Sequence, residues 1–337
     1  MTFHEADYYE CLPDGRVRCL LCPNSCTLKD GQAGVCRNRM NEGGKLLSLA
    51  YANVASAAID PIEKKPLLHF HPGSKAFSIG SCGCNLLCRG CQNWTISQVS
   101  PLEAEAYRLE PAALPSLMEG NCCRIAAYTY TEPLTYIEYV RDCSRICREH
   151  GFKNVLVTAG YANERPLREL VPLIDAVNID LKAFTPEAYR HYSHARLDTI
   201  LRSLIIMKEA GCWIEITNLI IPGVNDSMTM IKGMCQWLAS NGFADVPLHF
   251  SRFFPNYKLR EVPPTSLATL REARQVAREC GINYVYIGNT TLPGAEDTVC
   301  PGCGTVLVRR DGYHILSKSL AGEKCPHCGK PIPGYWD

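Results

Sequence analysis

Strand-like and helix-like segments alternate between about residue 75 and residue 290, and this alternation constrains the fold more than any other feature. Short apolar runs precede longer stretches with helical periodicity, and Gly151, Gly211 and Gly281 end three of these stretches as glycines commonly end helices. A repeat of about six or seven βα units predicts a parallel sheet. We therefore expect an α/β fold built on a partial (β/α)6 barrel, with the chemistry at the carboxyl ends of the strands.

The periodicity predicts the following boundaries. The expected strands span residues 75–81, 124–130, 154–158, 176–181, 213–221, 247–253 and 283–287. The expected helices span residues 134–150, 164–174, 198–210, 227–240 and 266–280. Cysteine-rich segments flank this core, so we expect an N-terminal module at residues 1–55, a core at 70–290 and a zinc-ribbon-like module at 291–337.

Composition narrows the class of protein. The net charge of +1 over 337 residues gives no electrostatic reason to expect nucleic acid or an anionic membrane as a partner. No apolar run is long enough to span a bilayer, and residues 1–10 lack the apolar centre of a secretory signal, so we expect a cytoplasmic protein. Its 20 cysteines then indicate metal binding rather than disulfides.

Three of these cysteines, Cys84, Cys88 and Cys91, have the spacing C-x3-C-x2-C directly after the first core strand. A cubane [4Fe–4S] cluster takes four thiolates, so a loop that offers three leaves one iron open to a small chelating molecule. The alternatives are part of a zinc site, with Cys82 as a cramped fourth ligand, or buried free thiols.

Both flanking modules offer four more thiols. Two C-x2-C pairs, each followed by glycine, suit a closed structural zinc site or rubredoxin-type iron; they are Cys300, Cys303, Cys325 and Cys328. The N-terminal set has uneven spacing that fits zinc, which we favour, or an auxiliary iron–sulfur cluster; it comprises Cys19, Cys22, Cys26 and Cys36.

Polar side chains follow the predicted core strands where a barrel carries its chemistry. They are Thr129, Tyr130, Glu132, Thr158, Asp180, Lys182, Asn218 and His249. Each has a simpler explanation as well: a helix start at residues 131–133, a turn at 158–160, a local ion pair at 180–182, a turn at 222–226 and a structural histidine.

Together these motifs make the chain resemble the AmmeMemoRadiSam system radical SAM enzymes, which are related to the pyruvate formate-lyase activating enzymes. The resemblance covers nearly the whole chain. It is carried by residues 19–22, 34–37, 60–70, 83–86, 128–133, 178–184, 221–226, 249–253 and 288–290, and by the C-terminal cysteines.

The resemblance implies a [4Fe–4S] cluster on the three loop cysteines and S-adenosylmethionine (SAM) at the open iron. One-electron cleavage of SAM would give methionine and a 5′-deoxyadenosyl radical, which takes hydrogen from an unidentified small-molecule or protein substrate. In such a barrel, residues 129–132 lie near the methionyl amino group. Asp180 and Lys182 would bind the cofactor carboxylate and ribose, the strand end after Asn218 would contact adenine, and His249 would contact ribose or substrate.

The resemblance also implies a flavodoxin or ferredoxin electron donor and association with Memo-like and AMMECR-like proteins. A glycyl-radical enzyme activase is the alternative function, and an RNA-modifying radical SAM enzyme or a catalytically inactive metal-binding scaffold fits less well. Two positions depart from the related enzymes. Gly90 replaces an aromatic residue before the last loop cysteine, and Val157 and Ala159 flank Thr158 where activating enzymes carry the Asp and Asn of a monovalent cation site.

Overall fold

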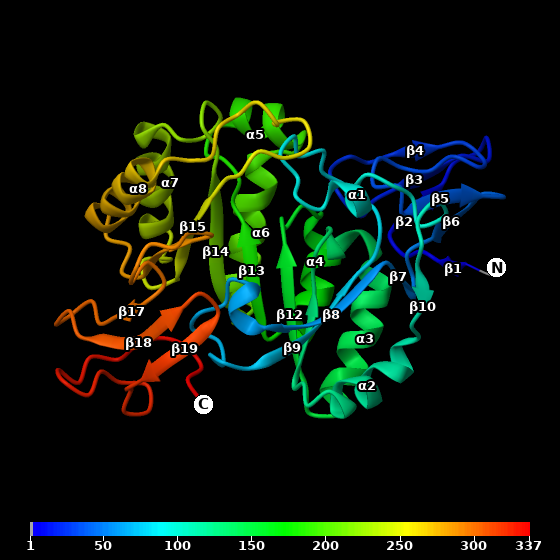
Figure 1. Ribbon diagram of the computed structural model, residues 1–337. Coiled ribbons are helices and arrows are strands. Elements are labelled where there is room, and N and C mark those ends of the chain that lie inside the picture. Colours follow the sequence, from blue (N-terminus) through cyan, green and yellow to red (C-terminus); the bar gives the residue numbers. More distant parts are fainter. Residues whose placement is uncertain (1–2) are drawn as a thin grey trace. The chain divides into compact units, whose positions relative to one another are not determined.

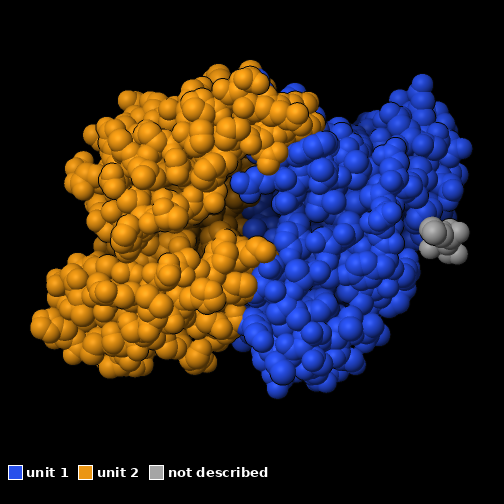
Figure 2. Space-filling model, in the orientation of Figure 1, with its two compact units in different colours: residues 1–60, 75–177, 193–212 blue, residues 61–74, 178–192, 213–337 orange. Residues whose placement is uncertain are grey.

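The computed structural model describes residues 3–337 (Figure 1). Residues 1–2, at the start of the expected N-terminal module, lie outside the described residues. The chain divides into two compact units (Figure 2): unit 1 comprises residues 1–60, 75–177 and 193–212, and unit 2 comprises residues 61–74, 178–192 and 213–337. Each unit is described separately below.

An eight-stranded sheet is the largest element of secondary structure, and its strand order is β16-β15-β14-β13-β12-β11-β9-β8. Its strands are β8 (Ser56–Pro61), β9 (Lys75–Gly80), β11 (Ile125–Tyr128), β12 (Lys153–Thr158), β13 (Ala176–Asp180), β14 (Trp213–Ile220), β15 (Leu248–Arg252) and β16 (Val285–Gly288). β11 pairs in parallel with β9 and β12, and β15 pairs in parallel with β14 and β16. The predicted α/β class with a mostly parallel sheet is confirmed, whereas its curvature into a partial barrel stays a prediction.

The long helices occupy the predicted segments. They are α3 (Ile137–Glu149), α4 (Glu164–Leu170) and α6 (Leu197–Glu209) in unit 1, and α7 (Met228–Ser240) and α8 (Leu267–Glu279) in unit 2. The helix expected over residues 164–174 ends early, and a 3-10 turn, Val171–Leu173, follows it. Pro172 lacks an amide hydrogen and its ring crowds the preceding turn, which explains the early end of α4.

The periodicity of apolar residues in the sequence did not predict the short helical elements. They are η1 (Ile62–Lys64), α1 (Trp94–Ser97), η2 (Pro111–Ala113), α2 (Leu114–Gly120), η3 (Pro133–Tyr136) and α5 (Pro186–Ser193). The helix expected from residue 134 begins with the η3 turn and becomes α-helical at Ile137. A segment of one or two turns contains too few residues to show a helical repeat.

Small antiparallel sheets make up both cysteine-rich ends (Figure 1). In unit 1 they contain β1 (His4–Glu5), β5 (Arg39–Glu42) and β6 (Lys45–Ser48), then β2 (Tyr9–Cys11), β3 (Val17–Cys19) and β4 (Thr27–Leu28), and β7 (Asn53–Val54) with β10 (Tyr107–Arg108). In unit 2, β17 (Thr298–Val299), β18 (Val306–Asp311) and β19 (His314–Lys318) form one sheet. Across residues 3–337, no helix combines the length and apolar character needed to cross a membrane.

Candidate active site and metal centres

The loop that carries the C-x3-C-x2-C motif connects β9 to α1 in unit 1. Gly83 opens it with a φ of 80°, and a Cβ built there would lie 2.3 Å from both the Asn38 side-chain oxygen and the Cys36 carbonyl oxygen. Only glycine fits this left-handed position and this close approach. At Gly83 the loop therefore packs closely against the N-terminal cysteine-rich segment.

Two sulfurs of this loop have hydrogen-bond partners. The backbone N–H of Leu86 donates to Cys84 Sγ at 3.4 Å, and Ser97 Oγ, at the end of α1, lies 3.3 Å from Cys91 Sγ. Burial raises the pKa of Cys84 well above its usual range, and the charges of Glu132, Cys88 and Cys91 raise it further. Burial therefore disfavours a free thiolate at Cys84, so bound metal is what would hold this thiol deprotonated.

Two predicted site residues, Glu132 and Thr158, meet at the ends of β11 and β12. The Glu132 carboxylate accepts hydrogen bonds from Thr158 Oγ1 at 2.5 Å, the Ala159 amide at 2.8 Å and the Leu134 amide at 3.1 Å. It is 2% exposed. This carboxylate joins the two strand ends, and its charge acts on the Cys84 thiol.

The Thr129–Tyr130 backbone is tied to the cysteine loop. Asn93 Nδ2 donates to the Tyr130 carbonyl at 2.6 Å, and Thr131 Oγ1 donates to the Ser81 carbonyl at 2.8 Å. Tyr130 has a φ of 71°, and its hydroxyl donates to Asp60 at 2.7 Å. Thr129 is 4% exposed. All four residues predicted from β11 and β12 therefore lie around the cysteine loop in unit 1.

The remaining predicted residues belong to unit 2. Lys182 Nζ lies 2.9 Å from Asp180 Oδ2, the local ion pair that is the simpler explanation for these two residues. The side chain of Asn218 donates to the Leu181 carbonyl at 2.6 Å, and the Asn225 side chain donates to the Lys182 carbonyl at 2.6 Å. These bonds hold the carboxyl ends of β13 and β14 together.

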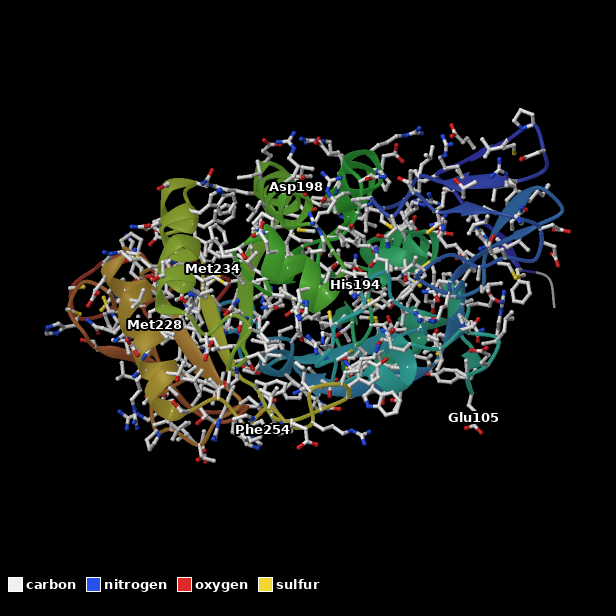
Figure 3. The ribbon with its side chains drawn as sticks, turned by 90° about the horizontal axis from the view of Figure 1, so that it is seen from above. Glu105, His194, Asp198, Met228, Met234 and Phe254 are labelled. Carbon is white, nitrogen blue, oxygen red and sulfur yellow. The ribbon has the colours of Figure 1, made fainter. Side chains whose placement is uncertain are left out.

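Asn218 and His249 lie on opposite faces of the strands. Side chains alternate along β14, so Asn218 points away from the face that carries Glu215, the partner of His249. Asn218 lines a small cavity with Met234 of α7, which is labelled in Figure 3, and its Oδ1 makes no hydrogen bond within the described chain. The structure thus does not bring these two predicted residues to one face.

His249 belongs to a buried polar network. Its Nε2 lies 2.7 Å from Glu215, which also accepts hydrogen bonds from the amides of Leu68 at 2.9 Å and His69 at 2.8 Å. The His69 ring in turn lies 2.5 Å from the Tyr286 hydroxyl. Burial lowers the pKa of His69 to about 4. Burial opposes ionisation of Glu215, yet the hydrogen bonds from His249 and from the Leu68 amide hold its pKa below the usual range.

Sequence reasoning missed Glu215 and His69 as partners of His249. The available signal was a carboxylate within an apolar strand, Trp213–Ile220, because a buried charge requires a partner. The role expected for His249 as a ribose or substrate contact stays a prediction.

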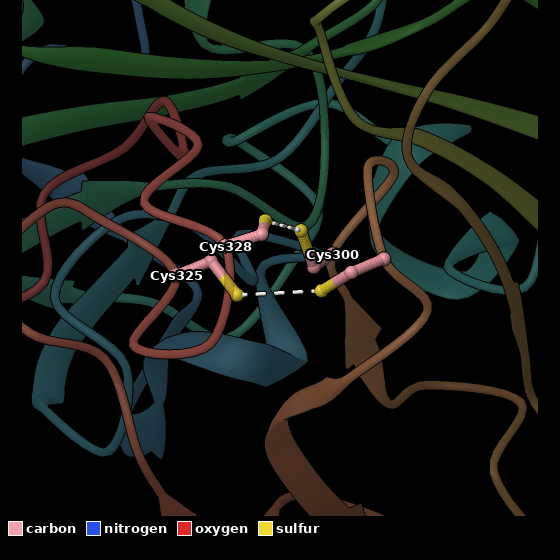
Figure 4. A group of neighbouring side chains, drawn as sticks. Cys300, Cys325 and Cys328 are labelled. Carbon is pink, nitrogen blue, oxygen red and sulfur yellow. Dashed lines mark hydrogen bonds between the residues drawn. The ribbon is translucent and has the colours of Figure 1, made fainter.

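The four C-terminal cysteines converge in unit 2 (Figure 4). The sulfurs of Cys300 and Cys328 lie 3.5 Å apart, those of Cys303 and Cys325 lie 3.6 Å apart, and all four lie within 4.8 Å of one another. The Thr305 hydroxyl, 3.2 Å from Cys303, lowers the pKa of that thiol to about 6. This set is a metal site with no position left for a substrate.

The four N-terminal cysteines line one cavity in unit 1 together with Arg39. Burial, with a smaller contribution from neighbouring thiols, raises the pKa of Cys22 to about 12 and that of Cys36 to about 11. Cys19 is also buried, and Cys26 is partly exposed. The structure therefore brings all four members of the predicted set together.

Comparison with known proteins identifies relatives of this chain, and the region matched by one family model includes the cysteine loop. A sequence model of the radical SAM superfamily matches residues 78–232. The uncharacterized protein MJ0808 of Methanocaldococcus jannaschii is 42% identical over 330 residues, covering 97% of this chain and 98% of that protein. The pyruvate formate-lyase 1-activating enzyme of Escherichia coli K12 is 21% identical over 223 residues, covering 60% of this chain and 89% of the enzyme.

Among solved structures, Streptococcus suis SuiB bound to S-adenosylmethionine has a similar fold. The TM-score is 0.50 at 14% identity, and the match covers 68% of this chain and 53% of SuiB. The chain belongs to the radical SAM superfamily and is related to the pyruvate formate-lyase activating enzymes. It is therefore an enzyme of the radical SAM class.

Proposed function

We propose that Cys84, Cys88 and Cys91 hold the [4Fe–4S] cluster with which this enzyme cleaves SAM. The observation that carries this proposal is the gathering of three thiols beside Glu132 on one loop, with N–H and O–H donors at two of the sulfurs. When bound, the cluster supplies one electron for cleavage of SAM to methionine and a 5′-deoxyadenosyl radical, which takes hydrogen from a substrate.

The chain's own residues would bind and orient SAM. In this proposal Thr129, Tyr130 and Glu132 surround the methionyl amino group, and the bond from Thr158 keeps the Glu132 carboxylate fixed. Buried carboxylate and carbonyl oxygens suit an ammonium group because they accept its hydrogen bonds.

The proposal also includes the four residues of unit 2 that the sequence predicts as cofactor contacts. Asp180 and Lys182 would bind the ribose and the carboxylate of SAM, and their ion pair would open to do so. The strand end after Asn218 would contact adenine. His249 would contact ribose or substrate while Glu215 holds its ring in place.

The test is anaerobic. The protein is reconstituted with iron and sulfide, reduced with dithionite and supplied with SAM, and 5′-deoxyadenosine is measured. We expect product from the wild-type enzyme and from Cys82→Ala, a buried cysteine outside the motif, and none from Cys84→Ala. Zinc in place of iron in the wild-type loop would contradict the proposal.

A glycyl-radical enzyme activase is the second candidate, favoured by the similarity to the pyruvate formate-lyase 1-activating enzyme. Its substrate would be a glycine in a loop of a large protein partner. A glycyl-radical electron paramagnetic resonance signal in a candidate partner, dependent on SAM and on Cys84, would establish this narrower function. The net charge of +1 gives no support to an RNA substrate.

We further propose membership of the AmmeMemoRadiSam system, with Memo-like and AMMECR-like partners, a flavodoxin or ferredoxin electron donor and a cytoplasmic location. The motifs of the N-terminal and C-terminal modules support this assignment. We also propose a partial barrel at residues 70–290, flanked in the sequence by modules at residues 1–55 and 291–337. The closely spaced C-terminal sulfurs suit Zn2+, which takes four thiolates in a tetrahedron.

A further inference from the structure

The N-terminal cysteines lie at the end of one strand and in the two turns that follow it. Cys19 ends β3, Cys22 and Cys26 lie in the turn before β4, and Cys36 lies in the turn before β5. The Cys19 amide donates to the Cys26 carbonyl at 2.9 Å, and Gly34 leaves room for the Cys26 sulfur, which would lie 3.4 Å from a Cβ there. The backbone thus directs all four side chains to one cavity.

The spacing of these sulfurs differs from that of the C-terminal set. Over residues 3–337, the C-terminal cysteines are the one group of three or more metal-ligating side chains whose ligand atoms all lie within 4.8 Å. The N-terminal sulfurs are therefore more widely spread. Tetrahedral zinc holds its four sulfurs about 3.8 Å apart. A cubane cluster holds them about 6.5 Å apart, because each thiolate binds a different iron.

Arg39 adds an independent observation. Its side chain lines the same cavity and is 1% exposed. One guanidinium nitrogen, Nη2, donates to the Glu138 carboxylate at 2.8 Å and to the Asp7 carbonyl, while Nε and Nη1 make no hydrogen bond within the described chain. Buried N–H groups without acceptors are costly. Sulfide and thiolate sulfurs of an anionic cluster would accept from them.

We propose that Cys19, Cys22, Cys26 and Cys36 hold a second [4Fe–4S] cluster, ligated by thiolates at all four irons. This assignment replaces the zinc that the uneven spacing alone favoured. It does not depend on the proposed cleavage of SAM. It concerns only the identity of the inorganic group that the four thiols and Arg39 surround. The cluster has no open iron, so it does not bind SAM itself.

Its position beside the first cluster loop follows from two contacts. Gly83, next to Cys84, closely approaches the Cys36 carbonyl, and Asn85 on the other side of Cys84 lines the N-terminal cavity. The two proposed clusters are therefore neighbours within unit 1.

The test uses the full-length chain with Cys84, Cys88 and Cys91 all changed to Ala. After anaerobic reconstitution, iron, sulfide and zinc per chain are quantified and the iron is examined by Mössbauer spectroscopy. We expect this triple variant to retain about four irons and about four sulfides with a [4Fe–4S] spectrum. Adding Cys36→Ser should abolish the iron, whereas adding Cys11→Ser, an exposed cysteine outside the set, should not.

A triple variant that binds no iron and carries about two zinc ions per chain would overturn the inference. This result does not depend on whether Cys36→Ser folds, because the N-terminal set is intact in the triple variant. A wild-type enzyme that forms 5′-deoxyadenosine with only about four irons would refute the second cluster and leave the proposed function standing. Iron in the triple variant supports the second cluster even if the wild-type enzyme fails to cleave SAM.

Discussion

The N-terminal and C-terminal modules both offer four cysteines, yet they arrange them differently. In the C-terminal module the sulfurs are in near contact, at 3.5 and 3.6 Å in two pairs. In the N-terminal module they surround a cavity and share it with a buried arginine. Cysteine count therefore does not identify a metal group, whereas the separation of the sulfurs and the charge beside them discriminate between one ion and a cluster.

Removal of metal should produce the largest difference between the two modules. Structural zinc contributes an apparent 10–16 kcal/mol, roughly, to the folding of small zinc domains. With the proposed zinc at the C-terminal cysteines, a strong zinc chelator at pH 7 should unfold residues 298–328, measured as loss of hydrogen-exchange protection. With the proposed cluster at the N-terminal cysteines, that module should keep its protection until an oxidant destroys the cluster. Equal loss in both modules on chelation would mean that both hold zinc.

Substitution of the two buried arginines should give the next largest effect. Arg39→Met leaves the Glu138 carboxylate, which is fully buried, without its cation, and should cost about 3–5 kcal/mol of unfolding free energy. Arg310→Met in the C-terminal module removes hydrogen bonds to Thr298 and to the Leu68 carbonyl, and should cost about 1–3 kcal/mol. Denaturant unfolding measures both, and a larger cost at Arg310 would reverse this comparison.

Acid should destabilise unit 2 through His69. Because burial lowers the folded-state pKa to about 4, the unfolded chain binds more protons between pH 6.5 and pH 4. The contribution of His69 is complete above pH 6.5 and is lost as the pH falls toward 4, by at most about 3 kcal/mol.

Hydrogen exchange of β14 and β15 across this pH range measures the effect. His69→Phe should be less stable at pH 7 because the ring loses its hydrogen bonds to the Tyr286 hydroxyl and the Pro333 carbonyl, but the slope of stability against pH should decrease. An unchanged slope would exclude His69 as the titrating group.

The smallest effect concerns a single thiol. Thr305→Val removes the hydroxyl that lowers the pKa of Cys303, so protons should displace the bound metal from the C-terminal site at a higher pH, by less than about one pH unit. Alkylation of the released Cys303 over a pH series, followed by peptide mass spectrometry, reports this change. Cys22, whose pKa is raised to about 12, should react slowly in both proteins and serves as the N-terminal comparison.

Local patterns predicted the long elements because their information lies within a few residues. Residues 75–81, 154–158 and 266–280 were expected from apolar runs and helical periodicity, and β9, β12 and α8 occupy them. The metal-binding cysteine pairs were likewise predicted from their short spacing in the sequence.

Long-range partners could not be predicted in this way. Glu215 meets His249 across 34 residues and the His69 amide across 146, and Arg39 meets Glu138 across 99. Nothing in the sequence near any of these residues specifies its partner. A single charged residue in an apolar segment indicates only that a partner exists.

The position of His69 has a consequence for biosynthesis. Residues 333–336 cover this histidine: the Pro333 carbonyl lies 2.8 Å from its Nδ1, the Tyr335 amide donates to its carbonyl at 2.7 Å, and the Trp336 ring lies 4.7 Å from its ring. His69 and Pro333 are 264 residues apart. At about 5–20 residues per second the ribosome needs roughly 13–53 s to make that stretch. The Glu215 network therefore stays incomplete until residues 333–336 have left the ribosome and cover it.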